Sequence, residues 1–192
     1  SMAIIMHLSK LSDVLNEAEL KIALDDQIRE KVKEVLYQRI IESKPLPYIT
    51  NEAYFCGKQF YVDERVLIPR SPLAELIEQS FAPWVDPEQV HRVLDLCTGS
   101  GCIAIACAYA FEHARVDGSD ICADALAVCK ENIERHGLGE QVRALQSDGL
   151  AAVDGPYDLI VSNPPYVDAQ DMASLPDEYR HEPELALASG ND

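Results

Sequence analysis

A planar amino group would fit one short segment of the sequence, Asn163-Pro164-Pro165-Tyr166, which follows three large apolar residues. The Asn163 side chain offers one acceptor and two donors in a plane. Pro164 and Pro165 lack an N–H group, so their carbonyl oxygens can face a ligand on a backbone of fixed φ. Tyr166 adds a flat ring for stacking. Together these residues could accept both hydrogens of an –NH2 group and leave its lone pair free to react; the simpler alternative is a proline turn that only ends a strand.

A glycine-rich turn further upstream is a candidate binding site for a nucleotide-like cofactor. The sequence LDLCTGSGCIA contains Gly99-x-Gly101-x-x-Ala104, which matches the dinucleotide fingerprint G-x-G-x-x-G/A. Residues without a Cβ atom let backbone N–H groups approach a ligand at the start of a helix. Alone, this match is a weak signal.

Three carboxylates near the ends of predicted strands narrow the choice of cofactor. Asp120 can accept both hydroxyls of a ribose, which fits a dinucleotide and S-adenosylmethionine equally well. Asp95 stands four residues before Gly99, where it could meet a cationic amino group, which a methionine moiety has and NAD lacks. Asp148 suits the exocyclic amine of adenine. Any one of them could merely cap a strand or a helix, but the three together favour S-adenosylmethionine.

Alternating strands and helices should position these residues. The apolar patterns predict strands over 93–96, 114–120, 142–148 and 157–162 and helices over 102–111 and 123–137. Gly137 should end the second helix in a left-handed conformation. Strands separated by helices of this length predict an α/β fold with a parallel sheet and right-handed crossovers.

The first part of the sequence predicts a separate helical module. Apolar spacings of three and four predict a helix from Asp25 to Ser43, with residues 12–24 as a weaker candidate, and the prolines of Lys44–Pro47 should end this region. A hairpin around Gly57 and a helix over 73–81 follow. We therefore expect three parts: a helical module over 1–47, a hairpin linker over 48–70 and a larger domain over 71–192.

Composition and charge restrict the class of partner. The chain is 47% hydrophobic and 26% charged, as in ordinary globular proteins, and no apolar run reaches the roughly 18 residues of a membrane span. With 16 basic and 33 acidic residues, its net charge of −17 disfavours phosphate backbones and suits a basic protein, unless the acidity serves only solubility. Six cysteines without a CxxC pair predict reduced thiols, a cytoplasmic location and no metal site.

Taken together, these motifs resemble S-adenosylmethionine-dependent methyltransferases that act on planar amino groups, which include DNA adenine and protein glutamine methyltransferases. The segment PYITNEAYFCGKQFYVDERVLIPRS is similar to the linker of the glutamine methyltransferases, and YVDAQDMASLPDEYRHEPELALASG is similar to their stretch after NPPY. The release-factor enzymes usually read IPRPxTE, whereas Ile68–Glu75 here resembles the branch that methylates a glutamine of the large-subunit ribosomal protein L-three.

The resemblance implies a Rossmann-like class I methyltransferase sheet, S-adenosyl-L-methionine as cofactor and S-adenosyl-L-homocysteine as product. It implies a basic ribosomal protein as substrate, with no direct DNA binding and no membrane. The residues expected to hold the target amide are Asn163, Pro164, Pro165 and Tyr166. Those expected at the cofactor are Asp95, Thr98, Gly99, Ser100, Gly101, Asp120, Asp148, Gly149 and Asn163.

One departure from the family bears on activity. The family's sheet has seven strands, but no strand is predicted after Tyr166, so we expect a C-terminally truncated sheet of strands one to four. The fourth strand would then form an exposed edge, open to self-association. A catalytically incomplete cofactor-binding fragment is therefore one alternative. A release-factor glutamine methyltransferase and an adenine-specific DNA methyltransferase are others, and an NAD-dependent oxidoreductase is more distant because it leaves Asn163–Tyr166 unexplained.

Overall fold

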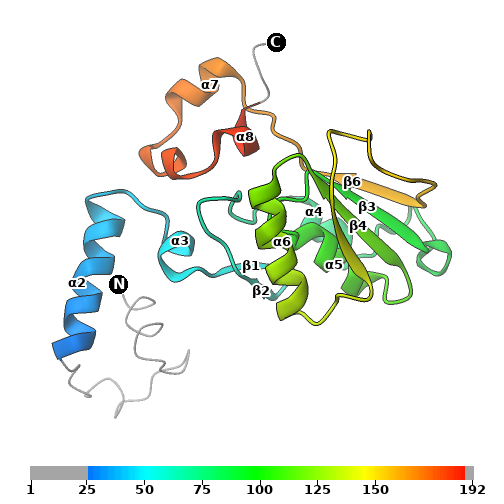
Figure 1. Ribbon diagram of the computed structural model, residues 1–192, viewed down its shortest axis with the longest axis horizontal. Coiled ribbons are helices and arrows are strands. Elements are labelled where there is room, and N and C mark those ends of the chain that lie inside the picture. The colour runs from blue at the N-terminus through cyan, green and yellow to red at the C-terminus, as the bar shows by residue number, and fades with distance from the viewer. Residues whose placement is uncertain (1–25, 189–192) are drawn as a thin grey trace. The chain divides into compact units, whose positions relative to one another are not determined.

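The computed structural model describes residues 26–188, and the chain divides into two compact units between Asn51 and Glu52 (Figure 1). The first unit contains α2 (Asp26–Ile40) and α3 (Leu46–Thr50). The helix predicted from Asp25 to Ser43 is confirmed as α2. The weaker candidate over 12–24 lies outside the described residues.

The hairpin linker, expected from residue 48, begins later than predicted, because residues 48–50 belong to α3. The prolines that should end helical structure instead stand at the beginning of this helix, with Pro45 as its N-cap. Proline is tolerated there because the first N–H groups of a helix have no intrahelical acceptor. Asn51 then ends α3 in a left-handed conformation, with φ of 56°.

The second unit opens with the predicted hairpin. Strands β1 (Ala53–Phe55) and β2 (Lys58–Phe60) are antiparallel and are joined by Cys56 and Gly57, which both have positive φ. Two positive φ angles in a two-residue connection match the twist of the flanking strands. Phe55 and Phe60 are buried in the hydrophobic core of this unit, so the hairpin packs as part of it.

Helix α4 (Leu73–Glu78) begins where the sequence predicts, but it ends three residues before Phe81. Ser80 and Phe81 adopt positive φ angles of 49° and 57°, which no α-helix can contain. Phe81 is buried and its ring stacks on Phe111 at 6.3 Å. Helix α4 therefore ends early, where the Phe81 side chain packs into the core. A short 3-10 helix, η2 (Pro87–Gln89), leads to the sheet.

A parallel sheet of β3 (Arg92–Leu96), β4 (Arg115–Asp120), β5 (Val142–Gln146) and β6 (Leu159–Ser162) forms the centre of the second unit. Its strand order is β5-β4-β3-β6, and every neighbouring pair is parallel. The chain builds outward from β3 to β5 and then returns to place β6 on the other side of β3. In such sheets ligands bind outside the carboxyl ends of the strands at this reversal point. The predicted α/β fold is confirmed.

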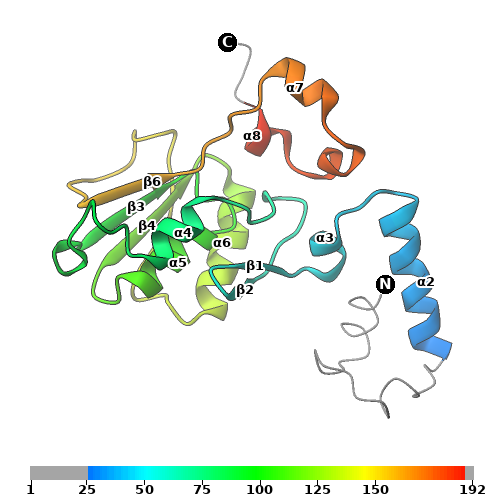
Figure 2. The same cartoon turned by 180° about the vertical axis from the view of Figure 1, so that it is seen from behind.

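Helices α5 (Cys102–Ala110) and α6 (Ala123–Arg135) connect these strands, and α5 also packs against α4 (Figures 1 and 2). Both right-handed crossovers run in the same direction along the sheet, so both helices cover the same face. Residues 102–108 of α5 are all buried, whereas α6 buries only one side. After α6, Gly137 has φ of 68°, which confirms its predicted left-handed conformation.

After β6 the chain makes an excursion through α7 (Ala169–Ser174), η3 (Asp177–His181) and α8 (Glu184–Leu187). The excursion closes on itself, because the Val167 N–H donates to the Leu187 carbonyl at 2.9 Å. Within the described residues β6 pairs only with β3, so it forms an edge of the sheet, and Ile160 on it is 56% exposed. Among residues 26–188, no helix has the length and apolar character needed to cross a membrane.

Candidate active site

A pocket opens at the carboxyl ends of β3, β4 and β6, and every residue that lines it belongs to the second unit. One wall is the turn after β3 together with the end of β4, residues 97–100 and 120–122. The segment 65–71 forms a second wall. Asn163 and Pro165 after β6 and residues from 183 to 186 also line the pocket, as do a few residues near the starts of α5 and α6. Segments more than 100 positions apart in the sequence therefore meet around one space.

The glycine turn takes its shape from close backbone packing. Gly99 and Gly101 have φ angles of 53° and 81°, a region that residues with side chains adopt only with strain. A Cβ atom on Gly101 would lie 2.7 Å from the Cys129 Sγ of α6. A Cβ atom on Gly118 of β4 would lie 2.8 Å from the Thr98 Oγ1. The turn is thus pressed against α6 and β4, while nothing within 4 Å occupies the position of a Cβ on Gly99.

Asp120 fixes the position of this turn and still has accepting capacity. Its Oδ2 accepts a hydrogen bond from the Gly99 N–H and its Oδ1 accepts one from the Cys122 N–H, both at 2.9 Å. An ionised carboxylate offers about four lone-pair sites, so two remain for a ligand. Because Asp120 lines the pocket and is only partly buried, these sites are accessible to hydroxyl donors.

Asp95 lies beneath the turn and is fully buried. Its Oδ2 accepts from the Thr98 hydroxyl at 2.6 Å and from the Ala104 N–H at 3.0 Å. Its Oδ1 has no hydrogen-bond partner in the described part of the chain. Burial raises the pKa of Asp95 to about 7 despite these two hydrogen bonds, and the nearby Asp120 adds to the shift. An unpaired buried acceptor beside the pocket fits a cationic donor group, although Asp95 itself does not line the pocket.

The structure brings two of the four NPPY residues to the pocket. Asn163 and Pro165 line it, whereas Pro164 is exposed and Tyr166 is 73% exposed outside it. Within residues 26–188 the Asn163 carboxamide has no hydrogen-bond partner, so both its acceptor and its donors are free for a ligand. The strand end before it is fixed, because the Ser162 hydroxyl donates to the Leu96 carbonyl of β3 at 2.8 Å.

Asp148 and Gly149 do not line the pocket, although the preceding Ser147 N–H donates to the Asp120 carbonyl at 3.0 Å. They follow β5 in an exposed turn, where Ser147 donates to the Gly149 carbonyl at 2.8 Å, and neither lines the pocket. The strand β5 lies at the far edge of the sheet, two places from β3. Contact of Asp148 with an adenine amine stays a prediction. Of the other expected cofactor residues, Thr98, Gly99 and Ser100 line the pocket, and Gly101 stands just behind them at the start of α5.

Local sequence patterns did not predict the wall formed by residues 65–71 or its contact with the excursion after β6. Glu182 is buried, and it accepts hydrogen bonds from the Ile68 N–H at 3.3 Å and the Arg70 guanidinium at 2.7 Å. These bonds tie the excursion after β6 to the segment that follows the hairpin. Ile121, beside Asp120, adds a half-exposed apolar side chain to the lining. Only the resemblance of IPRS to a family linker pointed to this wall, since no local pattern predicts a contact over 112 positions.

Comparison with known proteins agrees with this geometry. The methyltransferase small domain family matches residues 78–178. A relative from Francisella tularensis subsp. tularensis (strain SCHU S4 / Schu 4), named ribosomal protein uL3 glutamine methyltransferase, is 55% identical over 82% of this chain and 51% of its own length. A relative of the same name from Bordetella pertussis (strain Tohama I) is 49% identical over 85% of this chain and 56% of its own length. The chain thus spans about half the length of these curated relatives.

Among solved structures, the hMettl16 catalytic domain in complex with MAT2A 3'UTR hairpin 6 superposes with a TM-score of 0.51 at 14% identity. The superposition covers 96% of this chain and 67% of that one, and at this identity it bears on the fold alone. The parallel sheet with its glycine turn is a class I methyltransferase fold. The family match covers more than half of this chain, so the chain belongs to the methyltransferase small domain family.

Proposed function

We propose that this chain carries the catalytic site for S-adenosylmethionine-dependent methylation of a glutamine side-chain nitrogen in the ribosomal protein uL3. The observation that carries the proposal is the single pocket shared by the glycine turn, Asp120 and an unpaired Asn163 carboxamide. The names of two relatives at 49–55% identity supply the substrate. The fold and the pocket support methyl transfer to a planar amino group. The names of the relatives support a glutamine side-chain amide as that group.

The residues present fit S-adenosylmethionine. Ser100 has a backbone N–H group in the turn just before α5, and Asp120 has free acceptor sites for the ribose hydroxyls. The unpaired Oδ1 of Asp95 suits the ammonium of the methionine moiety. When bound, the cofactor supplies a methyl group on a positively charged sulfur.

In this proposal Asn163 orients the target glutamine amide. In the proposed transfer the glutamine nitrogen would bond to the methyl carbon as the bond from that carbon to sulfur breaks, leaving a neutral thioether, and the nitrogen would release one proton to solvent. An amide nitrogen is a poor nucleophile because its lone pair is delocalised, as the rotation barrier of about 18–20 kcal/mol indicates. Hydrogen bonds from both amide hydrogens, to the Asn163 oxygen and a proline carbonyl, orient the lone pair, and orientation can contribute roughly 7–11 kcal/mol.

The composition of the chain is consistent with such a substrate. Its net charge of −17 favours a basic protein over a nucleic acid, whose phosphates it would repel. The cysteines at 56, 97, 102, 107, 122 and 129 are all free thiols. Reduced thiols support a reducing compartment, which we take to be the cytoplasm.

A methyl-transfer assay tests the proposed function. The chain is incubated with methyl-labelled S-adenosylmethionine and, in separate reactions, with purified uL3, a release factor or adenine-containing duplex DNA, and the product is mapped by mass spectrometry. We expect label on a uL3 glutamine, and we expect Asn163→Ala to abolish the transfer. Label on DNA or on the release factor, or unchanged transfer by Asn163→Ala, would overturn the proposal.

A further inference from the structure

Asn132, in the last turn of α6, makes three hydrogen bonds that join the glycine turn to Tyr61 in the segment after the hairpin. Its side chain is fully buried, with a relative exposure of 0%. Its Oδ1 accepts from the Tyr61 N–H at 2.8 Å, and its Nδ2 donates to the Tyr61 carbonyl at 3.0 Å and to the Ser100 carbonyl at 2.9 Å. Both amide donors and one acceptor site are therefore used, each on a backbone group far away in the sequence.

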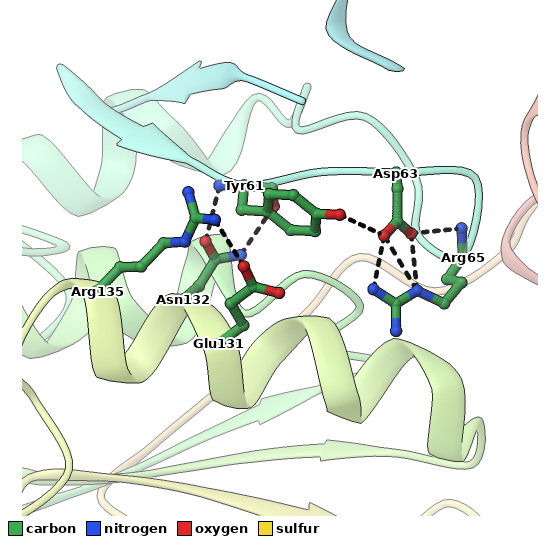
Figure 3. Close-up of polar contacts among 6 residues, drawn as sticks. All are labelled: Tyr61, Asp63, Arg65, Glu131, Asn132 and Arg135. Carbon is green, nitrogen blue, oxygen red and sulfur yellow. Dashed lines mark hydrogen bonds and ion pairs between the residues drawn. The ribbon is translucent and has the colours of Figure 1, made fainter. Parts of the chain in front are cut away.

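Tyr61 is held to α6 by its ring as well as by its backbone (Figure 3). The Arg135 guanidinium lies 4.6 Å from the centre of the Tyr61 ring, and Arg135 is itself paired with Glu131 at 2.6 Å. Cation–π contacts of this kind contribute about 0.5–1 kcal/mol at exposed sites. The segment after the hairpin therefore starts from a point that is fixed on α6.

From Tyr61 the contacts lead directly to the pocket wall. The Tyr61 hydroxyl donates to Asp63 Oδ2 at 3.0 Å, and Asp63 accepts from both the backbone N–H and the guanidinium of Arg65 (Figure 3). Arg65 is the first residue of the wall that runs to Ser71. Ser100, the other partner of Asn132, belongs to the glycine turn on the opposite wall. One carboxamide thus links the glycine turn to the residue from which the chain leads into the 65–71 wall.

We infer that Asn132 is a positioning residue that sets the spacing between the glycine turn and the 65–71 wall, and so determines cofactor affinity without touching the cofactor. The inference rests on the proposed function only in assuming that this pocket binds an adenosyl cofactor. Asparagine suits the task because it offers an acceptor and two donors in one rigid plane, which can bridge an N–H group and two carbonyls at once. A purely structural buried residue would affect the stability of the fold but not the geometry of the pocket in particular.

The test compares three variants by calorimetric titration with S-adenosylhomocysteine and by urea unfolding. Asn132→Asp keeps the shape and the acceptor but loses both donors, and Asn132→Ala avoids a buried charge where Asp prevents folding. Ile133→Ala is the matched control, since Ile133 is the next residue of α6, is 5% exposed and belongs to the hydrophobic core. We expect the Asn132 variants to bind at least about tenfold more weakly, and Ile133→Ala to lose stability while its affinity stays within about twofold.

Hydrogen exchange keeps the test independent of the ligand. Without ligand, Asn132→Ala should raise exchange at residues 97–102 and 61–67 together, whereas Ile133→Ala should not single out these segments. If the wild-type chain fails to bind S-adenosylhomocysteine, the proposed function fails, and the exchange pattern still decides the role of Asn132. Affinity of both Asn132 variants within about twofold of the wild type, or exchange raised equally by Ile133→Ala, would overturn the inference.

Discussion

Asp95 is a carboxylate shielded from water, and its protonation state links the stability of the fold to ligand binding. It is fully buried with one unpaired carboxylate oxygen, and burial raises its pKa to about 7. In an unfolded chain an aspartate has a pKa of about 3.9. Between these values the folded chain binds more protons than the unfolded one, so lowering the pH from about 7 towards 4 stabilises the free fold at this residue. A cationic ligand group has the opposite preference, because it requires the ionised form.

We therefore predict that the affinity for S-adenosylhomocysteine falls as the pH drops through about 7, by up to about tenfold per pH unit. The Asp95→Asn variant has no ionisable group at this position. It should therefore bind S-adenosylhomocysteine more weakly than the wild type at a pH of about 8, and its affinity should change little with pH. Calorimetric titrations of both proteins across this range check the prediction. Parallel pH profiles for the two would show that Asp95 does not meet a charged group.

At the scale of single residues, the sequence predicted the parts of the pocket that lie next to strand ends. Asp120, Asn163 and the glycine turn follow strands whose apolar patterns are clear, and the structure brings them together. Asp148 also follows a predicted strand, but it lies in an exposed turn and does not line the pocket, although the preceding Ser147 N–H donates to the Asp120 carbonyl at 3.0 Å. The conformation of the turn after β5, which decides where the Asp148 side chain lies, is not encoded in any local pattern.

At the scale of elements, close approach between the glycine turn and α6 is a requirement of the site. We predict that Gly101→Ala lowers the free energy of unfolding by about 1–3 kcal/mol, because its Cβ would lie 2.7 Å from Cys129 Sγ and its φ is 81°. Gly137→Ala is the control, since it has a φ of 68° and open space around its Cβ position. Urea unfolding should show the smaller loss for Gly137→Ala. Equal losses would mean that backbone strain alone, without packing against α6, explains the glycine at 101.

The exact ends of some helices depend on tertiary contacts, which local sequence patterns do not reveal. The four strands, α2, α5 and α6 were predicted to within a few residues because their apolar periodicity is strong. Helix α3 was missed because two prolines indicated an end where they mark a beginning. Helix α4 was predicted too long because Phe81 is apolar at helical spacing, yet it has a φ of 57° in the core.

The exposed edge of β6 also belongs to this scale. Ile160 is 56% exposed on a strand that has a single partner among the described residues, and such edges pair readily with other chains. We predict concentration-dependent self-association, which Ile160→Lys should suppress because a charge on an edge strand opposes pairing. Sedimentation velocity over a range of concentrations measures both proteins. A monomer at all concentrations would contradict the prediction.

At the scale of the whole molecule, the net charge of −17 should govern encounters with the substrate. We predict that association with a basic ribosomal protein slows by about tenfold when the salt concentration rises from low to moderately high, because screening removes electrostatic steering. Binding of S-adenosylhomocysteine in a pocket should change far less. Stopped-flow association and calorimetry at matched salt concentrations distinguish the two. A protein association rate that does not depend on salt would exclude charge as the basis of recognition.

The most direct test of the central claim, that one pocket holds both the cofactor and the target amide, is calorimetric titration with S-adenosylhomocysteine of the wild-type chain, Asp120→Ala and Asn163→Ala. Asp120 contacts the glycine turn, whereas Asn163 stands free on the other side of the pocket. We predict one-to-one binding by the wild type, weakened about tenfold or more by Asp120→Ala and changed only a few-fold by Asn163→Ala. Absence of binding by the wild type, or loss of binding with Asn163→Ala but not with Asp120→Ala, would contradict the claim.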